Sequence, residues 1–244
     1  MPKVSTNPNL VISYHRMRML VGMLGISLPF TLLIGNTIIN ELGLLNNDSL
    51  ILRECQKFYH PQSNFKDSIS DYYYTTVGEL FVGTLCAVAF FMFSYRGYPK
   101  KAGEFMPSDS FMTNLAGICA LGVAIFPTSQ TGCLSDNLRA FISSTSIGYI
   151  HYSFATVFFV SLSIMSLVNF RRTYAVEKFG TMPSHNFYKY CGIGILVSIA
   201  IIAIYSFTPL HESLKNIPVV FIFETTSLLF FGASWIKKGL IDSN

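Results

Sequence analysis

Charge is scarce in this sequence. Only 12% of the 244 residues are Asp, Glu, Lys or Arg, whereas 51% are hydrophobic. Because soluble domains carry about a quarter charged residues, this composition argues against a soluble globular protein. The net charge of +4 is small and forms no basic stripe along the chain, so the sequence predicts no nucleic-acid partner.

Short catalytic motifs are missing as well. The chain contains no HExxH, GxSxG, Walker or CxxC pattern, which excludes the common signatures of zincins, α/β-hydrolases, P-loop NTPases and thiol oxidoreductases. Its five cysteines show no zinc-finger spacing. Cys55 and Cys133 fall in two segments expected on the same side of a membrane. They would form one disulfide if that side is oxidising and their Cα atoms lie within ~7 Å.

Long apolar runs dominate what is present. Six runs have the roughly 17–25 residues that a helix needs to cross ~30 Å of hydrocarbon. They cover residues 19–39, 75–95, 110–126, 147–170, 188–207 and 217–236. Backbone groups in lipid must bond within their own segment, so each run is expected to be helical. We therefore predict an all-α, polytopic, six-transmembrane-helix bundle that forms a single domain over residues 1–244.

The basic residues predict how the chain is threaded. With the amino terminus in the cytoplasm, the inner segments hold twelve Lys and Arg residues and the outer segments hold five. This asymmetry predicts that both termini are cytoplasmic and that residues 40–74 form a long outer loop. The address is then the cell inner (cytoplasmic) membrane. Aromatic side chains near the run ends, such as Tyr95 and Trp235, are expected to anchor at the headgroup level.

Ionisable residues gather at the predicted outer side. At membrane depth each one costs ~2.5–3.5 kcal/mol, so such residues usually face the bundle interior. We expect a polar pocket in which Glu79, His151 and Glu224 are the candidate catalytic residues, and Asp71, Tyr74 and His211 are candidate ligand-binding residues. Glu224 is expected either to be protonated or to pair with a group from another helix, and His151 is the candidate nearest in depth. By sequence count, polar groups are concentrated on this side, which disfavours a transport path.

These side chains are compatible with more than one role. His151, His211 and Glu224 could bind a divalent metal, and a His–Glu pair could move a proton. The same groups could hold a lipid headgroup without chemistry. Structural alternatives also stand: Glu79 snorkels to the surface, His151 bonds a carbonyl at a helix end, His211 is an exposed loop residue, and Asp71 caps a helix.

Four stretches resemble a known group of proteins. They read "SISDYYYT…ELFVGTL…FFMFSYRGY", "NLAGICALGVAIFPT", "IGYIHYSFATVFF" and "PVVFIFETTSLLFFGASWIKKG". In this order they are similar to the bacterial six-helix membrane proteins grouped as domain of unknown function 998, over roughly residues 65–238. The resemblance rests on "SIS" before the second run, "FPT" closing the third and a His opening the fourth. It implies a fold and a membrane address.

A more distant analogy is to the alkaline ceramidase and adiponectin-receptor superfamily, which are membrane-embedded zinc hydrolases. That superfamily uses a Ser, an Asp and three His on seven helices. This chain offers Ser68 or Ser70, Asp71, His151 and His211, but it has six runs and no HxxxH pair in the last one. The analogy keeps a hydrolase among the alternatives.

Three functions follow as expectations. The first is a sensor, assembly factor or scaffold whose outer polar pocket binds a lipid or a partner. The second is a membrane-embedded hydrolase or lipid-modifying enzyme, which would depend on a divalent metal if the candidate ligands bind one. The third is a small proton-coupled transporter. Membrane lipids are the expected partners, and a homo-oligomer or a larger membrane complex is left open.

Overall fold

The protein is almost entirely helical in the part of the chain that the structure describes. The computed structural model describes residues 8–42, 65–97, 107–128, 146–171 and 182–242, and no strand occurs within them. Its long helices are α1 (Pro8–Glu41), α3 (Gly78–Ser94), α4 (Asp109–Ile125), α5 (Ser146–Ile164), α7 (Met182–Phe207) and α9 (Val219–Asp242). Shorter elements are the 3-10 helix η1 (Ser70–Tyr74), the π-helix η2 (Met165–Asn169) and α8 (Leu210–Ser213). The predicted all-α fold is confirmed.

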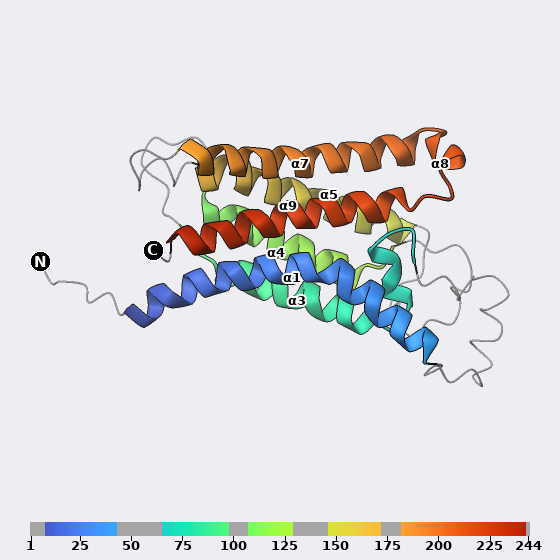
Figure 1. Cartoon of the computed structure of the whole chain (residues 1–244), viewed down its shortest axis with the longest axis horizontal. Helices are drawn as coiled ribbons and strands as arrows, with labels where there is room; N and C mark the ends of the chain where they lie inside the picture. The colour runs from blue at the N-terminus through green and yellow to red at the C-terminus, as the bar shows by residue number, and fades with distance from the viewer. Residues whose placement is uncertain (1–7, 43–64, 98–106, 129–145, 172–181, 243–244) are drawn as a thin grey trace, which may run out of the picture.

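The six long helices form a closed ring of antiparallel neighbours. Each packs against the next in chain order, and α1 closes the ring by packing against α9 (Figure 1). The first turn of α1 and the last turn of α9 lie at one end of the bundle, which we call the terminal end. The opposite end carries η1 and α8, and we call it the η1 end.

Glycine allows α1 and α9 to approach closely. A Cβ atom added to Gly22 would lie 2.7 Å from the carbonyl oxygen of Gly232, and one added to Gly232 would lie 2.5 Å from the carbonyl oxygen of Gly22. Neither backbone could accept a side chain there without moving apart. Small residues commonly bring helices together in this way within membranes, where the hydrophobic effect does not drive the helices together.

Large aromatic side chains fill the interior near the terminal end. Trp235 is fully buried, with its ring centroid 5.4 Å from that of Tyr95 and 5.5 Å from that of Phe170. The prediction that Tyr95 and Trp235 anchor at the headgroup level is therefore wrong. Both face into the ring of helices, where an aromatic cluster contributes packing that a residue count along one run cannot reveal.

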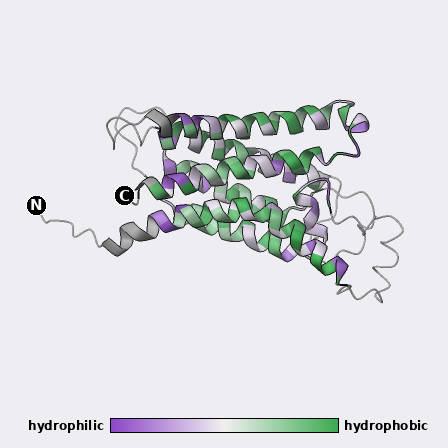
Figure 2. Ribbon diagram, in the orientation of Figure 1, coloured by the Kyte–Doolittle hydropathy of each residue, from purple (hydrophilic) through white to green (hydrophobic). Residues whose placement is uncertain are grey.

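Four helical segments are long and apolar enough to cross a membrane. They are His15–Glu41, Ile147–Asn169, Asn186–Phe207 and Val219–Leu240, while Gly78–Ser94 and Asp109–Ile125 are shorter apolar helices. Figure 2 shows hydrophobic residues along the middle of the helices and hydrophilic ones nearer their ends. Every predicted run overlaps one of the long helices, although the run at 75–95 begins before α3 and the run at 147–170 continues from α5 through η2. The run predicted at 19–39 is part of a helix that begins at Pro8, because hydropathy marks the apolar part of a helix and not its ends.

Candidate functional site

A short segment at the η1 end, residues 65–74, reaches across the ends of several helices. We call it the strap; it includes η1 and lies within the predicted loop 40–74. Its turn is built by two side chains: the backbone N–H of Ser68 donates to Asp71 Oδ2 at 3.0 Å, and the backbone N–H of Asp71 donates to Ser68 Oγ at 3.1 Å. Such reciprocal bonds, three residues apart, satisfy amides at the start of a helix. The prediction that Asp71 caps the second apolar helix is wrong, because α3 has Val77 at its N-cap without a side-chain bond and Asp71 bonds Ser68 within the strap.

The strap is bonded to the first turns of α9. The backbone N–H of Phe221 donates to the carbonyl oxygen of Asp67 at 2.8 Å, which satisfies one of the amides that a helix start leaves open. The backbone N–H of Ile69 donates to Glu224 Oε2 at 2.7 Å. The ring of Phe65 packs edge-on against that of Phe221, with centroids 4.7 Å apart. Glu224 therefore bonds the backbone of the strap and not a side chain of it.

A histidine joins the strap to α5. His151 Nδ1 lies 2.7 Å from the carbonyl oxygen of Phe126, and His151 Nε2 lies 2.8 Å from Ser70 Oγ. Because a carbonyl oxygen only accepts, Nδ1 carries the proton, and in a neutral imidazole Nε2 then accepts from the hydroxyl of Ser70. His151 and Ser70 are 2% and 7% exposed. The ring is fixed from both sides in a nearly closed environment.

The end of α4 is also tied to the strap. The hydroxyl of Tyr74 donates to the carbonyl oxygen of Thr128 at 2.6 Å, and the side-chain oxygens of Thr128 and Tyr152 lie 3.0 Å apart. The "FPT" sequence after α4 thus supplies two acceptors: Phe126 for His151 and Thr128 for Tyr74. Through these bonds the strap contacts α9, α5 and the end of α4.

Burial shifts the ionisation of the strap. It raises the pKa of Asp71, although the two hydrogen bonds with Ser68 act in the opposite direction. Burial also lowers the pKa of Lys66, while Asp71 and Asp67 raise it. The pKa of Tyr74 rises to about 12, mainly because its hydroxyl is withdrawn from water. The strap is thus a partly desolvated polar segment.

A hollow of about 420 Å³ opens beside the strap. Its lining consists of an aromatic ring, an acid, a base, an amide and a proline, namely Phe65, Asp67, Lys215, Asn216 and Pro218. The first two belong to the strap, and the other three lie on the segment that leads into α9. The hollow therefore combines both signs of charge with an apolar surface.

Four of the six predicted site residues meet at the strap. Asp71 and Tyr74 lie in it, while His151 and Glu224 bond to it from α5 and α9. His151, the candidate partner for Glu224, does not bond it: Glu224 accepts from the amide of Ile69, and His151 bonds the side chain of Ser70. The structural alternative for His151 is confirmed: its ring bonds a carbonyl oxygen at a helix end. It also bonds the hydroxyl of Ser70.

The other two residues stand apart from this network. Glu79 is exposed in the first turn of α3, where a negative charge complements the helix dipole. His211 is exposed on α8, and its Nδ1 donates to the carbonyl oxygen of Thr208 at 2.8 Å. Neither position places the side chain in the hydrogen-bond network that holds the strap.

The predicted metal ligands are not assembled. Among the described residues, no group of three or more His, Cys, Asp or Glu side chains could hold a metal ion, so His151, His211 and Glu224 do not form a metal site there. The physical reason is that Ser70 and Phe126 occupy both nitrogens of His151, while His211 lies on the surface of α8. Cys55 and Cys133 lie outside the described residues, and their disulfide stays a prediction.

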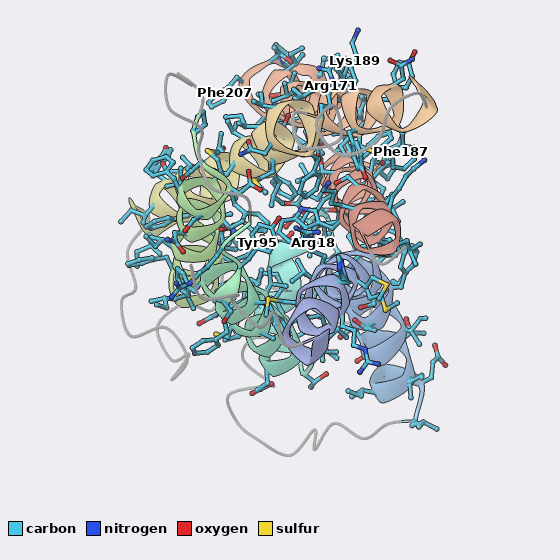
Figure 3. The ribbon with its side chains drawn as sticks, turned by 90° about the vertical axis from the view of Figure 1, so that its left-hand side faces the viewer. Arg18, Tyr95, Arg171, Phe187, Lys189 and Phe207 are labelled. Atoms are coloured by element: carbon cyan, nitrogen blue, oxygen red, sulfur yellow. The ribbon has the colours of Figure 1, made fainter. Side chains whose placement is uncertain are left out.

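Sequence reasoning missed a second buried polar cluster, at the terminal end. Arg18 is 4% exposed, and its Nη2 donates to the hydroxyl of Tyr95 at 2.9 Å. Asn169 Nδ2 donates to Asp109 Oδ1 at 2.7 Å, and Lys238 is 1% exposed. Figure 3 looks onto this end, with Arg18 and Tyr95 near the middle of the bundle. The expectation that polar groups gather on one side is wrong, since both ends bury them.

Comparison with known proteins returned no relative. No protein-family model matches the chain, and neither a curated protein nor a solved structure matches it.

Proposed function

We propose that this protein is a multi-pass protein of the cytoplasmic membrane that crosses it six times, with both termini in the cytoplasm. Twelve of the seventeen basic residues belong to the segments that would then be inside, in accord with the positive-inside rule. The first turn of α1 and the last turn of α9 lie at the same end of the bundle, as an even number of crossings requires. The 17 residues of α3 and of α4 meet the lower limit for a span.

In this orientation the η1 end faces outward, and its function is to bind a lipid at the strap, as a sensor or scaffold does. The observation that carries this proposal is the built strap with the hollow beside it. Side chains from α5 and α9 hold the strap in one position, and Asp67 belongs both to the strap and to the lining of the hollow. A preformed concave site with a few polar groups at its rim is the usual form of a ligand site.

The test is lipid retention by a variant that weakens the strap. Glu224→Met removes the oxygen that accepts from the Ile69 amide, and leaving a backbone N–H without its acceptor costs about 1–3 kcal/mol. Glu212→Met makes the same chemical change at an exposed acid on α8. Lipid that remains bound after detergent purification would be counted by native mass spectrometry.

We expect Glu224→Met to retain less lipid than the parent and Glu212→Met to retain the same amount, with all three proteins folded by circular dichroism. Equal retention by all three would contradict a lipid site that depends on the strap. Lipid loss accompanied by unfolding would be resolved with Ile69→Ala, which leaves the backbone amide in place and changes only the apolar side chain.

A hydrolase is the second candidate, and one observation favours it. The hydroxyl of Ser70 donates to an imidazole whose other nitrogen is held by a carbonyl, which is the arrangement that activates a serine nucleophile. In this mechanism His151 takes the proton of Ser70 as Oγ attacks an ester or amide carbonyl of a lipid, and then gives that proton to the departing alcohol or amine. Water, deprotonated by His151 in turn, releases the acyl group as an acid and restores Ser70. The strap would first have to expose Ser70, which is 7% exposed.

A fluorophosphonate probe separates the two candidates. A hydrolase should be labelled at Ser70, and Ser70→Ala should abolish labelling while Ser153→Ala leaves it unchanged. Ser153 is a suitable control because its hydroxyl is exposed and bonds only a carbonyl of its own helix. Absence of labelling in native membranes would exclude Ser70 as an accessible nucleophile.

A further inference from the structure

The hollow beside the strap has charges of opposite sign on its two sides. Asp67 stands on the strap, and Lys215 stands on the segment between α8 and α9. Both side chains are exposed, so both are available to a ligand that approaches from the η1 end. Phe65 adds an aromatic ring on the side of Asp67, and Asn216 adds an amide on the side of Lys215.

We propose that this hollow binds the headgroup of a zwitterionic phospholipid that carries a primary ammonium group, as phosphatidylethanolamine does. The proposal rests on the lipid-binding function given above and names its ligand class. The ammonium lies at Asp67 and Phe65, and the phosphate lies at Lys215 and Asn216.

The chemistry of each side fits one half of this headgroup. A primary ammonium has three N–H donors, which suit a carboxylate, and a cation also gains from the face of an aromatic ring. A phosphate accepts from an ammonium and from an amide N–H₂. The volume of about 420 Å³ lies in the range of small-molecule sites.

The same lining disfavours the other common headgroups. A phosphatidylglycerol headgroup brings a second acceptor-rich group with no positive charge to meet Asp67. A choline has no N–H to donate, and its recognition normally needs a cage of several aromatic rings, whereas Phe65 is the one aromatic residue in this lining.

The position of the hollow suits a membrane lipid. Apolar side chains next to it are exposed: Ile217, just before α9, is 47% exposed and Ile222, in α9, is 43% exposed. Since α9 is one of the helices able to span a membrane, acyl chains can lie along this apolar surface while the headgroup occupies the hollow.

Native mass spectrometry of the delipidated full-length protein tests the proposal. Phosphatidylethanolamine, phosphatidylglycerol and phosphatidylcholine with identical acyl chains would be titrated separately. We expect phosphatidylethanolamine to bind at least about threefold more tightly than the other two, since an exposed ion pair contributes up to roughly a fivefold difference in affinity.

Variants assign each half of the headgroup. Asp67→Asn should weaken phosphatidylethanolamine binding about three- to fivefold without weakening phosphatidylglycerol, and Lys215→Gln should weaken both. Glu212→Gln is the matched control, because Glu212 is an exposed acid on α8 that does not line the hollow. An Asp67→Asn protein with unchanged lipid preference would overturn the assignment.

Two further outcomes separate the possible failures. Equal affinity for the three lipids would overturn this inference while leaving the proposed lipid-binding function intact, whereas no saturable binding of any lipid would overturn the proposed function itself. Soluble glycerophosphoethanolamine should displace the lipid only in large excess, because it lacks acyl chains. Displacement at equal concentration would identify a free metabolite as the ligand and overturn the assignment to a lipid.

Discussion

Replacing Ser70 by Ala removes one oxygen atom from the contact between the strap and α5. That oxygen lies 2.8 Å from His151 Nε2, and both side chains are buried. The imidazole cannot turn to water without also losing its bond to the Phe126 carbonyl, so the variant leaves a buried polar atom unsatisfied. This costs about 1–3 kcal/mol. For a chain of this size, each kcal/mol corresponds to a fall in Tm of about 2–4 °C.

The assay is reversible unfolding in mixed micelles, with Ser153→Ala as the control. The hydroxyl of Ser153 is exposed and bonds the carbonyl of Tyr149, so its loss should change the free energy of unfolding by less than about 0.5 kcal/mol. The variants Ser70→Ala, His151→Phe and their double mutant complete a cycle. We expect a coupling energy of about 0.5–1.5 kcal/mol between the two residues. Strict additivity, or a Ser70→Ala effect no larger than that of the control, would refute the role given to this bond.

Three further predictions concern packing, ionisation and the terminal end. Gly232→Leu should destabilise the bundle by at least about 1–3 kcal/mol because it forces α1 from α9, whereas Gly83→Leu should be tolerated since nothing lies within 4 Å of its Cβ position; thermal unfolding distinguishes them. Tyr74 has a pKa raised from 10.0 to about 12, so its stabilising contribution is complete below pH 10 and is lost as the pH rises toward about 12; tyrosinate absorbance should show Tyr74→Phe missing one late-titrating phenol. Asn169→Leu removes the donor 2.7 Å from Asp109 Oδ1 and should cost about 1–3 kcal/mol in the same unfolding assay, and an unchanged midpoint would contradict this.

The helices could be predicted because lipid leaves an apolar segment little choice of structure. Every predicted run overlaps one of the long helices. Their ends could not be predicted equally well. The run ending at residue 236 continues as helix to Asp242, since a helix keeps its backbone bonds after its side chains become polar.

The meeting of His151 and Glu224 with the strap could be predicted in part. Counting residues from the helix ends placed both in the outer leaflet, and both do lie at the η1 end. Their partners could not be found in this way. Glu224 accepts from the backbone amide of Ile69, and every residue except proline has such an N–H, so the sequence does not show which one will bond. The strap also has no hydrophobic period to reveal where it docks.

The basic residues of the terminal end show a different limit. Arg18 and Lys238 counted toward the orientation of the chain, and such a count treats every charge as solvated. Both are buried in the structure. Long basic side chains can place their heads inside a bundle when polar groups receive them, as the hydroxyl of Tyr95 receives Arg18. Topology rules report on which side a charge lies and not on what it contacts.

The two ends of the bundle use buried polar groups in different ways, and this difference favours a binding function at the η1 end. At the terminal end, Arg18 lies in α1 and its partner Tyr95 directly follows the last residue of α3, so the bond joins two long helices. At the η1 end the bonds join helices to a connecting segment, which a ligand can move at lower cost. A headgroup would bind the side chain of Asp67, and the carbonyl oxygen of the same residue accepts from the backbone N–H of Phe221 in the first turn of α9. We therefore expect binding of a headgroup in the hollow to shift the first turn of α9, the helix that also packs against α1.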